Sequence, residues 1–238
     1  MIARTRSKLR VCAAISGQAT VLAAVLEAAR QELLPLEFCG FVADRPCGGL
    51  EIAKEFGIAS NCLDYKTFPS RDDFNEAFDA TVLSFAPDMV LLHYNRLVST
   101  RLLSALPEKV INTHYSLLPA FTGFRAIPRA LEMGVRFSGV TIHVVTERVD
   151  DGPILAQAVC PIQPRDTEAT LGFRLFAAAV PLTLGLLATA PNFEVDSDTS
   201  ERFSLPDETE AVLSVPLSER LRDFAGSFVA AKARGHRR

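Results

Sequence analysis

The chain has 238 residues, and its 48% hydrophobic and 22% charged composition is that of a globular protein with a sizeable core. A net charge of −3 provides no electrostatic footprint for nucleic acid. No apolar run approaches the roughly 20 residues that span a bilayer, and Leu9–Ile15 is too short for the core of a signal peptide. The five cysteines lack a Cys-x-x-Cys spacing. We therefore expect a cytoplasmic protein without a nucleic-acid or membrane partner.

The first half of the chain alternates between short apolar strands and helical patterns. We expect strands at Leu9–Ile15, Leu36–Val42, Met89–Leu92 and Val110–His114. We expect helices at Thr20–Leu33, at Gly49–Phe56, from a cap at Ser70 or Asp72 to Pro87, and at Ser99–Leu106. Such alternation predicts an α/β fold with a doubly wound, mostly parallel sheet and a Rossmann-like N-terminal half.

After Gly123 the pattern changes. We expect a helix at Ile127–Met133, longer strands at Ser138–Val145 and Ile154–Ile162, a long apolar helix at Thr167–Ala190, and one more helix within Leu213–Ala231. The stretch beyond Pro191 is acidic and polar. We therefore predict a catalytic domain over residues 1–190 and a C-terminal extension over 191–238, partly helical or loose. The basic end Lys232–Arg238 is expected to be a solvated terminus.

Two polar residues stand two positions apart where an apolar strand ends. Asn112 and His114 therefore point to the same face, at the edge where open α/β sheets bind ligands. A lone histidine on an apolar strand is by itself more typical of a core position. The tightly specified turn Ser116–Pro119 favours a functional position, because it would hold both side chains rigidly.

A second polar group follows the strand at Ser138–Val145. Thr141 and His143 alternate with apolar residues along it, and for His143 a core position and a functional one are equally expected. The loop after this strand presents Asp150 and Asp151. Asp151 precedes Gly-Pro and suits a turn, whereas Asp150 follows an apolar residue and is the better candidate for a functional acid. Asn, His and Asp together suit acyl chemistry without a metal.

These motifs resemble those of the formyltransferases that use 10-formyltetrahydrofolate. The matching patterns are Asn-x-His-x-Ser-x-Leu-Pro from Asn112, Gly-x-Thr-x-His from Gly139, and Asp-x-Gly-Pro-Ile from Asp150, with Gln157 in register. The resemblance runs from about Leu9 to Ala190. It is specific to the superfamily, while the substrate differs among its members. The interval from His114 to Asp150 is similar to that of the glycinamide ribonucleotide formyltransferases, which makes Asp150 the family aspartate.

The resemblance implies a role for each polar group. Asn112 would donate an N–H to the oxyanion of a tetrahedral intermediate, and His114 would donate a hydrogen bond or a proton to the same oxygen. Asp150 would favour the protonated form of His114 and help to move a proton from the amine to the folate. His143 and Thr141 would order the Asp150 loop. No metal is required.

The resemblance also implies where the folate binds. It would lie between the loop after Met89–Leu92 and the Asp150 loop, with Arg96 on the folate glutamate and Leu97 and Val98 lining the pteridine pocket. An exposed arginine without a role is the competing interpretation of Arg96. The other residues that we expect to support or contact substrates are Ser116, Gly123, Gly17 and Thr20. The expected partners are folate and a small amine acceptor, and a homodimer is left open.

The acceptor side departs from the glycinamide ribonucleotide enzymes. Their phosphate loop, Gly-Asn-Gly-Ser-Asn, corresponds here to Gly17–Val21, in which Ala19 replaces a glycine and Val21 an amide. Thr20 alone keeps a hydroxyl. The substrate-binding glutamate of the family falls near Ala179, which offers no polar side chain. This comparison does not favour glycinamide ribonucleotide as the acceptor.

Other branches of the superfamily are alternatives. The segment His114–Gly123 is also similar to formyltetrahydrofolate deformylases, which hydrolyse the formyl group, although these carry an N-terminal regulatory domain. Sugar-nucleotide N-formyltransferases share the motif, and Arg202–Pro206 resembles their extensions. The acidic tail disfavours the methionyl-tRNA branch. A non-catalytic folate-binding relative is the remaining alternative, which the presence of all three polar residues disfavours.

Overall fold

One eight-stranded sheet organises the chain, in the order β3-β2-β1-β4-β5-β6-β7-β8. The computed structural model describes residues 8–189 and 212–235. The parallel strands are β1 (Leu9–Ile15), β2 (Leu36–Ala43), β3 (Ser60–Cys62), β4 (Met89–His93) and β5 (Val110–His114). The antiparallel strands are β6 (Phe137–Val144), β7 (Ile154–Pro161) and β8 (Val212–Leu213). The predicted doubly wound, mostly parallel α/β sheet is confirmed. The short strands β3 and β8 were not predicted, because β3 is mostly polar and β8 has only two residues.

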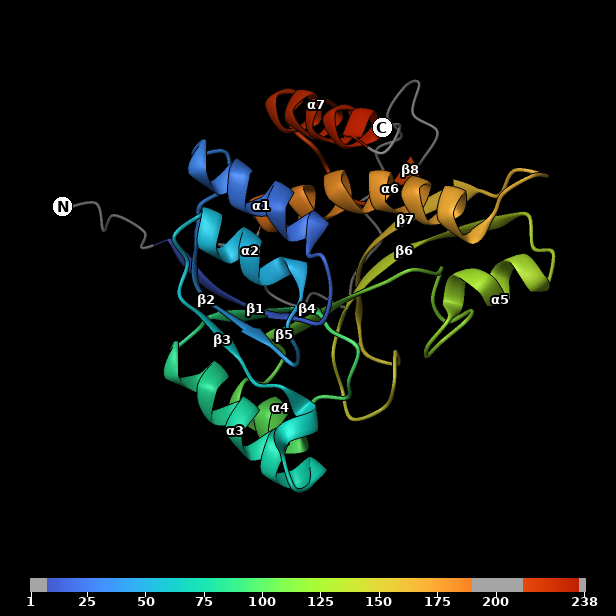
Figure 1. Cartoon of the computed structure of the whole chain (residues 1–238). Coiled ribbons are helices and arrows are strands. Elements are labelled where there is room, and N and C mark those ends of the chain that lie inside the picture. Colours follow the sequence, from blue (N-terminus) through green and yellow to red (C-terminus); the bar gives the residue numbers. More distant parts are fainter. Residues whose placement is uncertain (1–7, 190–211, 236–238) are drawn as a thin grey trace.

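Helices cover both faces of the sheet (Figure 1). On one face lie α1 (Thr20–Arg30), α2 (Gly48–Glu55), α6 (Glu168–Thr189) and α7 (Glu219–Gly235); on the other lie α3 (Arg71–Ser84) and α4 (Thr100–Ala105). A 3-10 turn (Tyr65–Thr67) precedes α3, and α5 (Ala126–Glu132) follows β5. Alternate residues of β1 divide between two cores: Val11 and Ala13 pack with α1 and α6, Cys12 and Ala14 with α3 and α4. The Ser70 cap of α3 is present, with its Oγ accepting the Asp73 N–H.

Helix α6 corrects the expectation that no segment is long and apolar enough to span a bilayer. Among the described residues it passes that test by length and composition, with a mean hydropathy of 1.8. However, 61% of the tested window is buried inside the protein. Buried residues such as Leu175, Leu182 and Leu186 pack into the same core as α1 and the sheet. In this structure α6 is therefore a core helix.

The C-terminal extension joins the fold at two points. β8 pairs with β7, so the predicted helix over Leu213–Ala231 begins only at Glu219, after Pro216. Helix α7 then continues to Gly235, and Lys232, Arg234 and Gly235 are exposed, so the described part of the basic end is a solvated helix end. The acidic stretch with Arg202–Pro206 and both chain ends (residues 1–7 and 236–238) lie outside the described residues. The division into domains at residue 190 stays a prediction.

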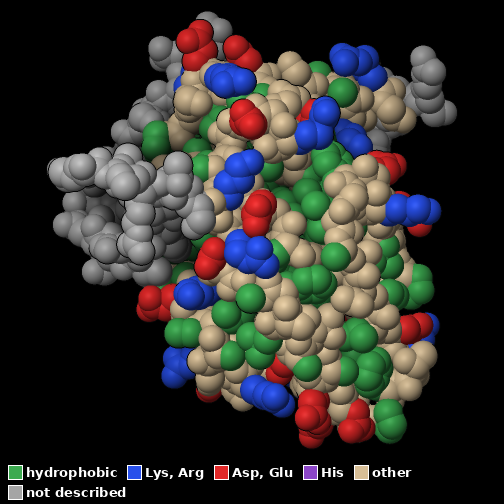
Figure 2. Space-filling view, turned by 90° about the vertical axis from the view of Figure 1, so that its left-hand side faces the viewer, with side chains coloured by type: hydrophobic (Ala, Val, Ile, Leu, Met, Phe, Trp, Pro, Cys, Tyr) green, Lys and Arg blue, Asp and Glu red, His purple; other side chains and the backbone are tan. Residues whose placement is uncertain are grey.

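One face of the molecule carries charges of both signs. Figure 2 shows Lys and Arg side chains scattered among Asp and Glu side chains over the described part of this face. Exposed hydrophobic side chains lie between them. This distribution agrees with the small net charge of −3 and offers no single-sign surface on that face.

Candidate active site

Hydrogen bonds to side chains of β6 and β7 hold the turn after β5. Ser116 Oγ donates to the carbonyl of Ala120 at 2.6 Å. Thr141 Oγ1, on β6, donates to the Ser116 carbonyl at 2.7 Å and accepts the Leu118 N–H at 3.1 Å. Gln157 Nε2, on β7, donates to the Leu118 carbonyl at 3.1 Å. Ser116 and Thr141 are fully buried, so both support the turn from within. Thr141 thus orders this turn rather than the Asp150 loop, contrary to expectation.

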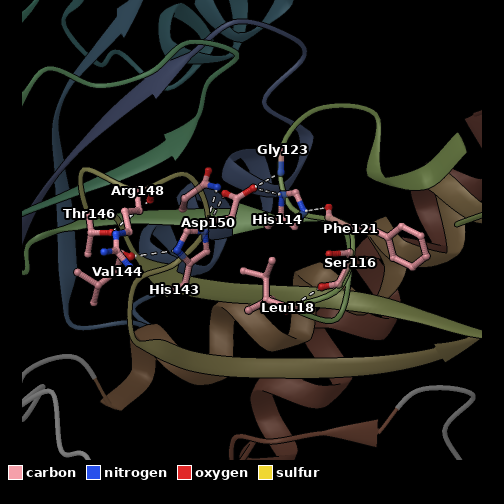
Figure 3. A network of polar contacts seen from close by, with 12 residues as sticks. His114, Ser116, Leu118, Phe121, Gly123, His143, Val144, Thr146, Arg148 and Asp150 are labelled. Atoms are coloured by element: carbon pink, nitrogen blue, oxygen red, sulfur yellow. Dashed lines mark hydrogen bonds and ion pairs between the residues drawn. The ribbon is translucent and has the colours of Figure 1, made fainter. Parts of the chain in front are cut away.

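Asp150 lies between two imidazole rings (Figure 3). Its Oδ2 is 3.3 Å from Nδ1 of His114, and its Oδ1 is 3.4 Å from Nε2 of His143. The Gly123 N–H donates to the same Oδ2 at 2.7 Å. Asp150 also has φ 54°, a left-handed conformation that is strained for a residue with a Cβ. Strained residues concentrate at functional sites.

The Asp150 carboxylate is held in its charged form. Burial raises its pKa, but hydrogen bonds from His143 and the Gly123 N–H and the charge of His114 outweigh burial, and its pKa lies below the usual value. Neighbouring Asp151 is 58% exposed and pairs with Arg148 at the surface. The geometry therefore brings Asp150, and not Asp151, to the polar cluster.

Both ring nitrogens of His114 face acceptors. Nε2 lies 2.9 Å from the Phe121 carbonyl, and Nδ1 faces the Asp150 carboxylate. A ring with protons on both nitrogens satisfies both partners, because neither oxygen can donate. The side chain is 9% exposed at the end of β5. An imidazole N–H oriented by a carboxylate is suited to donating a hydrogen bond to a substrate oxygen that gains negative charge.

His143 orients the amide of Asn112. Its Nδ1 lies 3.0 Å from the Val144 carbonyl and must carry the proton of that hydrogen bond. Nε2 lies 3.2 Å from Asn112 Nδ2 and 3.4 Å from Asp150 Oδ1; it accepts from the amide in the neutral ring and donates to the carboxylate in the protonated ring. With the neutral ring, one N–H of Asn112 therefore points to His143, and the second remains for a ligand. His143 is 2% exposed, so this orientation is fixed by packing as well.

A cavity of about 770 Å³ opens onto this polar cluster. Its walls come from the loops after β1, β4, β5 and β6, from one face of α6 and from the end of α7. The predicted residues that line it are Asn112, His114, His143, Asp150, Gly17, Thr20, Arg96, Leu97, Val98 and Gly123. Leu97 and Val149 line its edge while 47% and 46% exposed. Burial lowers the pKa of His93, another lining residue, to about 4.

Arg96 is a fixed side chain. Its Nε donates to Asp44 Oδ2 at 2.7 Å, and its guanidinium stacks 3.4 Å from the Tyr65 ring centroid. Burial raises the pKa of Asp44, but hydrogen bonds from Arg45, Ser16 and Arg96 hold it below its usual value. A smaller cavity of about 210 Å³ adjoins Arg96 and is lined by Tyr65, Arg71, Asn75, Asn95 and Leu97. Arg96 is therefore not a free surface arginine.

The acceptor side differs from the sequence expectation on α6. Ala179 is fully buried in the core, so it does not face the cavity. The cavity face of α6 instead presents Glu168, Phe173 and Phe176. At the start of α1, Ala19 adopts φ 51° without a side-chain cap. The loop side chains at Ala19 and Val21 contribute no hydrogen-bond donor to this part of the cavity.

The chain is similar in sequence and fold to known formyltransferases. The formyl transferase family profile matches residues 9–182, which is more than half of the chain. The chain belongs to the formyl transferase family. The predicted family, formyltransferases that use a formyl-folate, is therefore confirmed.

Relatives of this formyl transferase include single enzymes and parts of larger ones. The phosphoribosylglycinamide formyltransferase of Mycobacterium tuberculosis is 34% identical over 70% of this chain and 77% of its own length. The trifunctional purine biosynthetic protein adenosine-3 of Gallus gallus is 34% identical over 77% of this chain, which spans only 19% of that protein. Glycinamide ribonucleotide transformylase 1 from Symbiobacterium toebii has a TM-score of 0.77 at 34% identity, covering 81% of this chain and 92% of that one. A formyltetrahydrofolate deformylase from Pseudomonas syringae shares the fold, with a TM-score of 0.72 at 22% identity, covering 87% of this chain and 66% of that one.

The sequence did not predict several residues that line or support the two cavities. They are Asp44, Tyr65, Arg71, Glu168 and Lys232. Asp44 had a usable signal, since a carboxylate directly after a buried parallel strand lies at the ligand edge of the sheet. Tyr65 and Arg71 belong to segments without strong periodicity. Lys232 had no local signal, because its position depends on how α7 packs.

Proposed function

We propose that the protein transfers the formyl group of 10-formyltetrahydrofolate to the primary amine of a small acceptor, with glycinamide ribonucleotide as the acceptor. The observation that supports this proposal most is the cluster of Asn112, His114 and Asp150, which faces a cavity of about 770 Å³. The acceptor assignment is supported by relatives whose names specify phosphoribosylglycinamide or glycinamide ribonucleotide. The loop at Gly17–Val21 differs from the phosphate loop of the glycinamide ribonucleotide enzymes, so the experiment below tests the acceptor directly.

The residues fit the chemistry of formyl transfer. The acceptor nitrogen forms a bond to the formyl carbon, and the carbonyl electron pair moves onto oxygen. Asn112 donates its free N–H to this oxyanion, a contribution of about 3–4 kcal/mol. His114 exchanges its bond to the Phe121 carbonyl for one to the same oxygen. The oxyanion then reforms the carbonyl as the bond to the folate nitrogen breaks, and that nitrogen takes up the proton lost by the amine.

Asp150 has two tasks in this scheme. Its charge stabilises the imidazolium form of His114, whose Nδ1 lies 3.3 Å away. It is also the carboxylate at the reacting centre that can accept a proton from the attacking amine and pass it to the folate nitrogen. The bond from Gly123 and the contact to His143 hold it in position for both tasks.

The folate has a matching surface in the cavity. Leu97, Val98 and Val149 offer apolar side chains on the two loops that flank the polar cluster, and a flat pteridine would cover those that are exposed. Arg96 and Arg71 line the smaller adjoining cavity, where two guanidinium groups suit the carboxylates of the folate glutamate.

The decisive experiment follows the formyl carbon. The protein is incubated with ¹³C-formyl-labelled 10-formyltetrahydrofolate and glycinamide ribonucleotide, and the products are identified by NMR. An N-formyl product that appears only with the acceptor supports the proposal. Formate released at the same rate without acceptor would establish a deformylase. Product formed only with an amino-sugar nucleotide would replace the acceptor, and tight folate binding without turnover would indicate a non-catalytic relative.

A further inference from the structure

We propose that Lys232, on helix α7 of the C-terminal extension, binds the anionic group of the amine acceptor. This inference rests on the proposed formyl transfer. Lys232 lines the same cavity as His114 and Asp150, although it lies outside the segment 9–182 that matches the family. Figure 1 shows α7 lying along α1 and α6, the helices whose ends and faces form the acceptor side of the cavity.

The packing of α7 brings Lys232 to the cavity. Leu221 and Ala225 are buried in the main core, and Phe228 packs against it. These residues and Lys232 follow one another at intervals of four, three and four, which places all of them on one face of the helix. Lys232 is the next position on this face, and there the helix has reached the cavity. Its Nζ lies 5.7 Å from the centroid of the Phe228 ring.

The charge of Lys232 is available to a ligand. In the part of the chain that the structure describes, its ammonium makes no ion pair within 4.0 Å. Arg125, another cation of the cavity wall, is 3.7 Å from Glu132. An ammonium on a flexible stem can follow an anion at the cavity edge.

The neighbouring loop explains why a cation is needed at this place. Ala19 and Val21 supply no side-chain donor, which leaves the uncharged side chains of Gln18 and Thr20 and the backbone to meet an anionic acceptor. A phosphate monoester carries up to two negative charges and would lack a counter-charge from this loop. Lys232 supplies that charge from a separate element. The expected ligand is therefore a primary amine that carries an anionic group, of which a ribose phosphate is the example.

The test compares Lys232→Ala with a control on the same helix. Arg234→Ala removes a nearby positive charge that does not line the cavity. In steady-state formyl transfer, K232A should raise the KM for glycinamide ribonucleotide about tenfold or more, the loss expected for a hydrogen bond to a charged group. The folate KM and kcat should change less than about twofold by the same reasoning. Lys232→Arg should retain most of the affinity, and R234A should match the wild type.

A second acceptor separates charge recognition from a structural effect. Glycinamide riboside lacks the phosphate, so wild type and K232A should use it equally. An unchanged KM for the ribonucleotide in K232A, or an equal loss for riboside and ribonucleotide, would overturn the proposal. If the wild type forms no formylated product, the proposed function fails, and calorimetric binding of the same two compounds still tests Lys232. A wild-type preference for the ribonucleotide that K232A loses supports the role; equal affinities of the two proteins for the ribonucleotide overturn it.

Discussion

The carboxylate of Asp150 lies 3.3 Å from Nδ1 of His114, although His114 ends strand β5 and Asp150 lies in the loop after β6. β6 runs antiparallel to β5 and ends beside the start of β5, where Val144 pairs with Ile111. The loop after β6 therefore folds back along β5 to bring Asp150 to His114. The left-handed backbone of Asp150 and its bond from the Gly123 N–H keep the carboxylate there. This ion pair is the centre of the proposed site.

His114→Ala should lower kcat by roughly 10²–10⁴, the range expected when a general acid–base group is lost. The side chain is at the edge of the cavity, so circular dichroism and the melting temperature should remain close to those of the wild type. The measurement is steady-state formyl transfer at saturating folate and acceptor. A kcat within a few-fold of the wild type would remove His114 from the mechanism.

His143→Ala should act through Asn112. Without the contact at 3.2 Å the Asn112 amide can rotate, and the loss of an oriented donor should lower kcat by about 10–100-fold. A double-mutant cycle with Asn112→Ala checks the mechanism. We expect the fold-loss of kcat in the double variant to be much smaller than the product of the two single fold-losses. Fully multiplicative effects would show that His143 acts independently of Asn112.

Gly152→Ala should distort the Asp150 loop. A Cβ at Gly152 would lie 1.9 Å from the Val144 carbonyl oxygen, so the backbone must shift. We expect a lower melting temperature and a kcat lowered at least about tenfold, because a small misplacement of a catalytic group is costly. The control is Gly226→Ala on α7, where a Cβ meets nothing within 4 Å and alanine favours the helix. An active, stable G152A would contradict the packing argument.

Asp79→Asn should stabilise the protein at neutral pH. Asp79 is 1% exposed, its Oδ2 accepts from Ser99, and its Oδ1 has no partner among the described residues. Burial raises the pKa of Asp79, which means that folding favours the protonated acid. The wild type therefore loses stability as the pH rises through the folded pKa, and the variant does not. Urea unfolding should show a gain of about 1 kcal/mol at pH 8 that shrinks toward pH 4; a destabilised variant at pH 8 would contradict this.

His93 should make the fold sensitive to mild acid. Its pKa is lowered to about 4 by burial, whereas an unfolded histidine has the ordinary 6.5. The unfolded chain therefore binds the proton first, and stability that is complete above pH 6.5 is lost as the pH falls toward 4. Urea unfolding should show that the free energy of unfolding falls by about 2 kcal/mol over this window. This is less than the full pKa shift would give, because His93 is partly exposed. His93→Gln should flatten this pH dependence, and an equally steep profile would assign the effect to other groups.

The sequence predicted that Asn112 and His114 share a face because they are two residues apart on one strand, and the family resemblance implied that Asp150 joins them. Strand alternation alone places Asn112 and His114 on one face, and the position of Asp150 after an apolar residue separates it from Asp151. The parallel sheet followed from the alternation of apolar strands and helices. These inferences need only short-range periodicity, and the structure agrees with them.

The acceptor side could not be predicted in the same way. Helix α6 is apolar around most of its circumference, so its pattern does not tell which residues face the cavity. The expectation near Ala179 failed for this reason, and Phe176 faces the cavity instead. Arg96 and Asp44 meet across 52 residues of sequence, and Lys232 depends on the packing of α7. Such contacts are set by tertiary packing.

The most direct test of the catalytic assignment compares Asp150→Asn with Asp151→Asn. The two variants make the same chemical change at adjacent positions, one in the polar cluster and one at the surface. We predict that D150N lowers kcat for formyl transfer by about 10²-fold or more, while D151N stays within about twofold of the wild type because an exposed ion pair contributes little. Equal activity of the two variants, or a loss only in D151N, would contradict the site described by His114 and Asp150.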